Sequence, residues 1–464
     1  MNRQSLLGWQ PRVLAQKRHD PIPAGPADAV AALPNGRTVS FGSTVRSLLG
    51  GALGNVIEWY DWFVYASFSL YFAHSFFPAA DRTAALLNTS AIFAVGFLTR
   101  PLGAWLWGRA ADRYGRKPTL IAAVLLMCIG SLLIAVVPGY SRIGIWAPVA
   151  LAVGRMMQGL SVGGEYGVGV TYLVEWAPPT KRGIWASLHY VTIIIGQLLA
   201  LSVLLLLRYA FLSDVEITTW AWRIPFAISG GLAAALYFIR RGMEEAPPFI
   251  VAQRARHTED RKALLSTFRR RMLLVFAMAV GPNVAYYTFS SYVQKLLVVS
   301  AGFPVPQASL VCVLALIGFG VAQPIAGALS DAIGRKPLLL GFGVVGLMST
   351  VPLLTAISNA RSPAAALLFV ACALLILSAA TSAGTAAKAE LFPAELRALG
   401  VGLPFALSIS VFGGTAEYIA LWLKAAGHGS YFGWYVTACI AVSLVAFLKI
   451  PETRWVHMGA LFAR

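Results

Sequence analysis

The sequence predicts an all-α polytopic membrane protein that crosses the bilayer twelve times, in two halves of six helices. Three observations lead to this fold class. Only 12% of the 464 residues are charged and 58% are hydrophobic, whereas soluble domains average about 25% charged residues. The chain also divides into twelve apolar stretches, and a short motif of its first half recurs in its second. The four cysteines lie singly within apolar stretches, where they are expected to pack as small hydrophobic residues.

Each apolar stretch is long enough to cross the hydrocarbon core as a helix, which takes about 20 residues. We expect spans at about 44–73, 88–108, 118–138, 146–175, 184–208, 220–241, 271–298, 308–330, 337–357, 363–388, 398–424 and 430–450. Because their number is even, both termini lie on one side of the membrane.

The basic residues decide which side that is. Six Lys or Arg precede or enter the first span, four lie in 109–117, nine lie in 240–271, and the loop 299–307 has none. Cytoplasmic loops carry the excess of Lys and Arg, so we expect both termini in the cytoplasm. The net charge of +18 lies in these loops, and this distribution argues against nucleic acid as a partner.

The spans and loops define five regions. The first is polar, rich in Pro, Ala and Gly, and lacks the apolar segment of a signal peptide. We expect a cytoplasmic and disordered tail at 1–43, a six-helix bundle at 44–241, a central cytoplasmic loop at 242–270, a second bundle at 271–450 and a short cytoplasmic tail at 451–464.

Two loop motifs are duplicated between the halves. GRAADRYGRKP (108–118) recurs as GALSDAIGRKP (327–337), and the spacing E-x-x-P-x-x-x-R occurs at 175–182 and again at 390–397. Two halves related by a parallel repeat are typical of transporters that work by rocking. We expect their charged residues to clamp helix ends as a cytoplasmic gate, although charge runs in loops are ordinarily solvated: Asp112, Arg116, Asp331, Arg335, Glu175, Arg182, Glu390 and Arg397.

The motif G-x-x-x-D-R-x-G-R-K after the second span resembles a loop signature of the major facilitator superfamily. GNVIEWYDWFVYASFSLYFAHSFFP (54–78), QGLSVGGEYG (158–167) and ELFPAELRALGVG (390–402) resemble its metabolite:proton symporter family. This resemblance implies the major facilitator fold, a monomer in the bacterial inner membrane, and proton-coupled import of a small organic acid with no cofactor beyond the proton. It favours the dicarboxylate α-ketoglutarate, with shikimate, citrate or a zwitterion such as proline or betaine as alternatives.

Carboxylates within the spans are the candidates for proton coupling. Glu58 and Asp61 lie three residues apart near the middle of the first span, so they share one side of the helix. A carboxylate costs about 2.5–3.5 kcal/mol at that depth, and burial or a nearby cation shifts its protonation. We assign proton coupling to Glu58, Asp61 and Glu165, with a static pairing to arginine as the alternative.

Arg100 and Arg155 lie in the second and fourth spans, and their guanidinium groups suit a substrate carboxylate. Helix pairing is the alternative for both. In the seventh span, polar residues recur at helical spacing, so they are expected to line a cavity or face another helix. The candidate substrate-binding residues are Arg100, Arg155, Tyr65, Asn283, Tyr286, Tyr287 and Gln197.

Three further residues are ambiguous from the sequence. Lys295 lies near the outer end of its span, where its long side chain can reach the interface. Glu417 can pair with Lys424 two turns on or take part in coupling, and His189 is more simply a core histidine than a proton relay.

Other classes of protein fit less well. The sequence has no GxxxxGK[ST] loop, metal constellation or nucleophile–base motif, so neither ATP-driven transport nor an enzyme is expected. A transporter-like osmosensor would be expected to carry a long helical extension, whereas only PETRWVHMGALFAR (451–464), without heptads, follows the last span.

Overall fold

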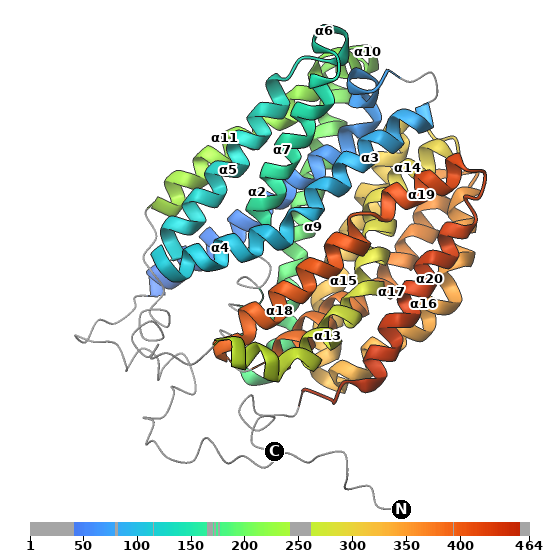
Figure 1. Ribbon diagram of the computed structural model, residues 1–464. Helices are drawn as coiled ribbons and strands as arrows, with labels where there is room; N and C mark the ends of the chain where they lie inside the picture. Colours follow the sequence, from blue (N-terminus) through green and yellow to red (C-terminus); the bar gives the residue numbers. More distant parts are fainter. Residues whose placement is uncertain are drawn as a thin grey trace, which may run out of the picture.

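The computed structural model describes residues 41–78, 82–114, 116–164, 170, 173–174, 177–241, 261–392 and 394–454. All regular secondary structure in these ranges is helical, and every predicted span overlaps a helix. Eight helical stretches of the described part are long and apolar enough to cross a membrane. Figure 1 shows the helices of the first half, blue to green, beside those of the second half, yellow to red.

The first half begins with one long helix and continues with shorter ones. In its second span, a turn at Thr99 separates two helices, so that Arg100 begins the second of them. The helices are α2 (Phe41–Phe76), α3 (Arg82–Leu98), α4 (Arg100–Tyr114), α5 (Arg116–Val136), α6 (Tyr140–Ile143), α7 (Trp146–Val162), α9 (Arg182–Leu206), α10 (Asp214–Thr219) and α11 (Ile224–Arg241).

The second half contains two spans that are interrupted by π-helical turns, η4 (Tyr287–Tyr292) and η5 (Ile409–Gly413). Such turns are rare and occur mostly at functional sites. The α-helices are α13 (Arg261–Tyr286), α14 (Val293–Val299), α15 (Val305–Ile333), α16 (Arg335–Ser358), α17 (Pro363–Glu390), α18 (Ala394–Ser408), α19 (Ala416–Ala425) and α20 (Tyr431–Lys449).

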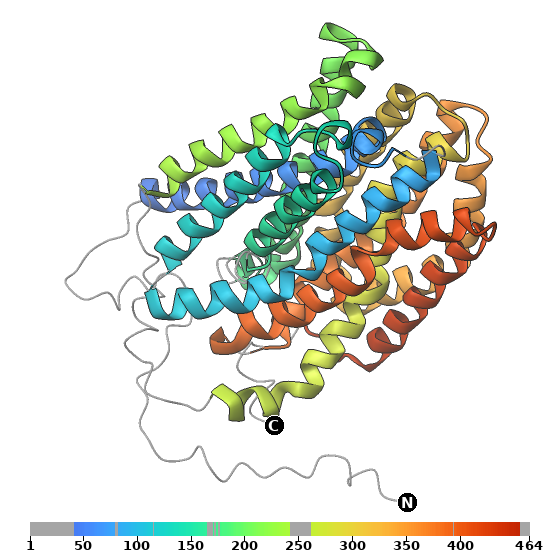
Figure 2. The same ribbon diagram turned by 45° about the horizontal axis from the view of Figure 1, so that its top comes forward.

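The two halves meet along helices that are far apart in sequence. Helix α9 packs against α15 and α17, α4 against α18, and α3 against α19 and η5; Figure 2 gives a second view of this interface. Small residues allow the closest approach. A Cβ added to Gly183 would lie 2.5 Å from the carbonyl oxygen of Gly327, and one added to Gly327 would lie 2.7 Å from that of Gly183.

The segment after the last span is anchored to the start of α16. The carboxylate of Glu452 accepts hydrogen bonds from the backbone N–H groups of Arg335 (2.9 Å) and Lys336 (3.0 Å). Partial burial would raise the pKa of Glu452, but these bonds and one from Arg454 outweigh it, and the pKa is lowered below its ordinary value of 4.5. Glu452 therefore caps a helix from outside the membrane-spanning region.

Glu452→Gln is expected to lower the free energy of unfolding by about 1 kcal/mol at neutral pH, as the loss of a helix cap does. Because the folded pKa is depressed, the contribution is fully present above pH 4.5 and is lost as the pH falls through the folded value. Thermal unfolding of both proteins in detergent between pH 7 and pH 3 measures this. A difference that persists unchanged at the acidic end would contradict the assignment.

Candidate functional site

A cavity lies between the two halves. It is large enough for water. Its polar lining comes from the first half, on α2, α4 and α9, and its C-terminal-half wall is apolar. The lining residues are Asn55, Glu58, Trp59, Arg100, Val162, Gly163, His189, Phe405, Ala406 and Ile409. Of the residues that the sequence marked as candidates, Glu58 and Arg100 are brought together here.

Arg100 is held by aromatic rings. Its guanidinium carbon lies 3.9 Å from the ring centroid of Trp62, 4.2 Å from that of Phe97 and 5.3 Å from that of Trp59. The side chain is buried, and its Nε and Nη2 atoms have no hydrogen-bond partner among the described residues. The guanidinium group interacts electrostatically with Tyr287 and, less strongly, with Glu58. Stacking therefore fixes the plane of a cation that keeps donors for another ligand.

Asp61 belongs to a different network from Glu58, although they are three residues apart. The Ser131 hydroxyl donates to Asp61 Oδ1 (2.5 Å) and accepts from Gln158 Nε2 (3.0 Å), and Arg155 Nη1 donates to Gln158 Oε1 (2.8 Å). All four side chains are fully buried between α2, α5 and α7. Arg155 does not line the cavity, so the structure separates the two arginines that the sequence grouped as carboxylate anchors.

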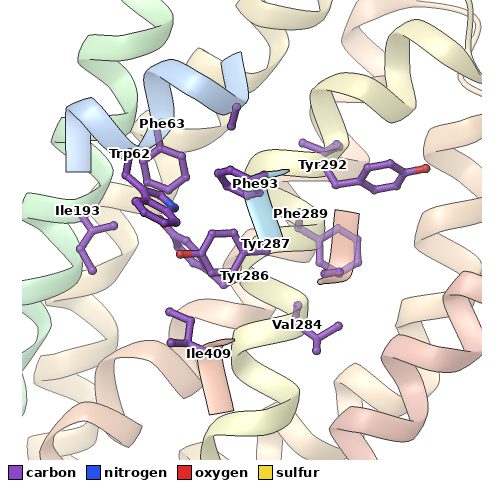
Figure 3. Close-up of a cluster of buried hydrophobic side chains, with 14 of the residues drawn as sticks. Trp62, Phe63, Phe93, Ile193, Val284, Tyr286, Tyr287, Phe289, Tyr292 and Ile409 are labelled. Carbon is purple, nitrogen blue, oxygen red and sulfur yellow. The ribbon is translucent and has the colours of Figure 1, made fainter. Parts of the chain in front are cut away.

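One tryptophan joins the cavity to this network. The guanidinium carbons of Arg100 and Arg155 lie 3.9 and 4.0 Å from the ring centroid of Trp62. Figure 3 shows Trp62 and Phe63 facing Tyr286 and Tyr287 of the other half. Trp62 thus contacts both arginines at once.

The other predicted substrate-binding side chains make contacts outside the cavity. Tyr65 donates to the carbonyl of Thr89 (2.9 Å), and Asn283 donates to Ser408 (3.4 Å). Tyr286 donates to Gln197 (3.4 Å), whose amide donates to the carbonyl of Ser290 (2.7 Å). Of these residues, Tyr286 and Gln197 join the two halves.

A second charged cluster joins the halves toward the outer side. Lys295 Nζ lies 2.9 Å from Glu417 Oε1 and donates to the carbonyl of Ala66 (3.1 Å). The Ser90 hydroxyl donates to the same carboxylate oxygen. Lys295 and Glu417 are buried, so Lys295 does not reach the interface. Glu417 pairs with Lys295, and Lys424 instead bonds the Val299 carbonyl and Ser300.

Removing one partner of this outer pair is expected to destabilise the protein more than removing both. Lys295→Met leaves a buried carboxylate uncompensated, which costs about 3–5 kcal/mol, whereas replacing a whole buried pair by apolar residues is often close to neutral. We expect Lys295→Met to unfold at a lower temperature than the double variant Lys295→Met/Glu417→Leu. Lys424→Met, which removes a half-buried lysine of the same region, is the control. A double variant less stable than either single one would contradict the pairing.

At the cytoplasmic end, four of the predicted gating residues come together. Arg335 donates to Asp331 (2.7 Å) and to Glu390 (3.1 Å), and Asp331 accepts from the backbone N–H groups of Gly183 (2.8 Å) and Ile184 (3.0 Å). Arg182, half-buried, interacts electrostatically with Asp331 and Glu390. Asp331 thus caps helix α9 of the other half, and we call Asp331, Arg335, Glu390 and the start of α9 the cytoplasmic latch.

The structure describes the remaining predicted residues only in part. Arg397 donates to the carbonyls of Ala389 (3.0 Å) and Phe392 (3.2 Å). Asp112 lies within α4 and Arg116 begins α5, and their side chains are outside the described part of the chain. Glu165 and Glu175 lie outside the described residues, so their predicted roles stay predictions.

Two helical halves around a buried, charged cavity, joined at both ends, define a secondary transporter. The chain matches the family described as "Sugar (and other) transporter" over residues 49–267 and 261–459. It therefore belongs to this family of the major facilitator superfamily, as a multi-pass inner-membrane protein.

Individual relatives cover nearly the whole chain. Alpha-ketoglutarate permease of Escherichia coli (strain K12) is 46% identical over 408 residues, which are 88% of this chain and 93% of that protein. Citrate-proton symporter of Klebsiella pneumoniae is 31% identical over 87% of this chain and 91% of its own length. The solved structure of a D-xylose-proton symporter has the same fold, with a TM-score of 0.69 at 19% identity, covering 88% of this chain and 98% of that one.

Proposed function

We propose that this protein is a proton-coupled symporter that imports a small dicarboxylate, with α-ketoglutarate as the candidate substrate, by alternating access. The observation that carries the proposal is Arg100, a buried cation with two guanidinium nitrogens that have no hydrogen-bond partner among the described residues. Arg100 lines the cavity between the halves. The 46% identity to alpha-ketoglutarate permease supports the choice of substrate.

Arg100 is suited to a carboxylate because a guanidinium group donates two parallel hydrogen bonds to it and stays charged throughout the cycle. Its stacking on Trp59, Trp62 and Phe97 also argues against a betaine-like cargo. A quaternary ammonium group is recognised by the faces of aromatic rings, and here those rings already hold a guanidinium group. Of the alternatives, an organic anion fits the cavity better.

Glu58 supplies the coupling. It lines the cavity with Arg100, and the two interact electrostatically. When the substrate carboxylate binds Arg100, it takes the place of Glu58 as the partner of that cation. A proton from outside then binds Glu58 and neutralises its carboxylate. Release of the substrate inside restores the interaction and returns the proton to the cytoplasm. Proton and substrate therefore cross together because each favours the binding of the other.

Alternating access requires that only one end opens at a time. In this structure the halves are joined at the outer side, where Lys295 bonds Ala66 and Glu417 bonds Ser90, and at the cytoplasmic latch, where Asp331 caps α9. The cavity is smaller than a dicarboxylate, so substrate enters after Lys295 and Glu417 have parted from Ala66 and Ser90 of the first half. The cytoplasmic latch stays closed during that step.

The test is uptake of radiolabelled α-ketoglutarate into proteoliposomes that contain the purified protein, with and without an inward proton gradient. Uptake that requires the gradient and is competed by unlabelled dicarboxylates supports the proposal. Shikimate, citrate, proline and betaine serve as further competitors. Uptake of one of these in place of α-ketoglutarate would overturn the substrate assignment.

A further inference from the structure

The cavity contains a titratable side chain that the proposed coupling does not use. His189 of α9 lines it together with Glu58 and Arg100 and has only 4% of its surface exposed. The other two histidines of the described residues, His74 and His428, are exposed. An imidazole takes up and releases a proton near neutral pH, so His189 is placed to change its charge in contact with a bound substrate.

The charges of the cavity make a second proton necessary for a dianion. Without substrate, the negative charge of Glu58 offsets the positive charge of Arg100. A dicarboxylate adds two negative charges, and one proton on Glu58 removes only one of them. An uncompensated charge in a closed cavity at this depth costs several kcal/mol. A second proton, taken up by a group that lines the same cavity, makes the loaded site neutral.

We propose that His189 binds this second proton and, as an imidazolium, holds the second carboxylate of the substrate opposite Arg100. The inference rests on the proposed function, since it requires a dicarboxylate as cargo. Two protons from outside then bind Glu58 and His189, travel with the dianion and leave to the cytoplasm. Arg155, the other cation considered for that carboxylate, does not line the cavity and donates to Gln158 instead.

The surroundings of His189 single out Glu58 and Arg100 as its charged neighbours in the cavity. Tyr190 contacts its ring, and Asn55 shares the cavity lining. Other charged groups on the elements packed against α9 have contacts elsewhere: Asp61 with Ser131, Asp331 and Glu390 with Arg335, and Arg208 with Asp214. Lys388 does not line the cavity, but it lies over the ring of Phe405, which does. Glu58 and Arg100 are therefore the charged residues that line the cavity together with His189.

The experiment counts protons. Proteoliposomes are held at zero membrane potential with an inward gradient of one pH unit, and the final accumulation ratio of α-ketoglutarate is measured. Symport with two protons accumulates the substrate about 100-fold, and symport with one proton about tenfold, because each proton contributes a factor of ten. We expect about 100-fold for the wild type and about tenfold for His189→Gln. His74→Gln, which changes an exposed histidine, is expected to keep the wild-type ratio.

A wild-type ratio near tenfold, or a His189→Gln variant that keeps the wild-type ratio, would overturn the inference and leave the proposed function standing. No accumulation by the wild type would instead overturn the proposed function. Calorimetric titration of the purified proteins in buffers of different ionisation enthalpy gives an independent count. In this titration His189→Gln is expected to take up about one proton fewer per bound α-ketoglutarate than the wild type. If the variant does not bind, the wild type alone is decisive, and an uptake of fewer than two protons per bound α-ketoglutarate would overturn the inference.

Discussion

Arg100→Gln is expected to lower α-ketoglutarate uptake about 100-fold, because removing one member of a buried charge contact costs about 2–5 kcal/mol. Glutamine keeps hydrogen-bonding capacity but not the charge, and in the variant Glu58 would line the cavity without its cation. The loss therefore affects both substrate binding and the protonation of Glu58. Initial rates over a range of substrate concentrations and pH values measure both effects.

Two further variants show whether the guanidinium group itself is required. Arg100→Lys keeps the charge but cannot stack flat against Trp62 and Phe97, so we expect it to remain strongly impaired. Arg361→Gln removes an exposed arginine and should transport normally. An Arg100→Lys protein with wild-type uptake would show that only a positive charge is needed, and uptake by Arg100→Gln at the wild-type rate would rule out Arg100 as the anchor.

Arg335→Gln is expected to open the cytoplasmic end. Arg335 is fully buried and bonds both Asp331 and Glu390, so its loss leaves these two buried carboxylates with only the half-buried Arg182 nearby. Breaking such a cluster costs about 3–5 kcal/mol. Because the cost falls on the conformation in which the halves are joined, the equilibrium shifts toward the inward-open form and net import falls.

Thiol labelling from the cytoplasmic side measures this shift. Ser187 is buried near the start of α9, and a cysteine placed there, with the four native cysteines replaced, becomes accessible only when that end opens. We expect labelling of Ser187→Cys to be about 100-fold faster in the Arg335→Gln background. Lys449→Gln, an exposed lysine at the same end, is the matched control. Equal labelling rates in the two backgrounds would mean that the cluster does not hold this end closed.

The number of spans was accessible from the sequence because lipid imposes length and polarity on each helix independently. Each predicted span overlaps a helix, and the superfamily is confirmed. The interruptions within spans could not be predicted in the same way. The turn at Thr99 and the π-helical turns η4 and η5 arise from packing between helices that are far apart in the chain, which leaves no local periodicity.

The functional site, too, could be predicted from the sequence only in part. The duplicated motif pointed to Asp331 and Arg335, which do meet, since repetition can be seen in one sequence. Glu58 and Asp61 share one side of α2, yet neighbouring helices direct them into separate environments. Spacing along one helix also gave no indication that Lys295 and Glu417 pair. Which side chains on different helices contact each other depends on tertiary packing, and the periodicity of a single helix carries no information about that packing.

The π-helical turns have a consequence for how the outer end separates. A π-helical turn contains one extra residue. The helix after it can therefore rotate relative to the helix before it while the backbone N–H groups of the turn change from one carbonyl partner to the next. Lys295 follows η4 in α14, and Glu417 follows η5 in α19. Both members of the outer pair thus sit on short segments beyond a π-helical turn. We expect these segments to turn away from Ala66 and Ser90 of the first half while the helices of the cytoplasmic latch keep their positions.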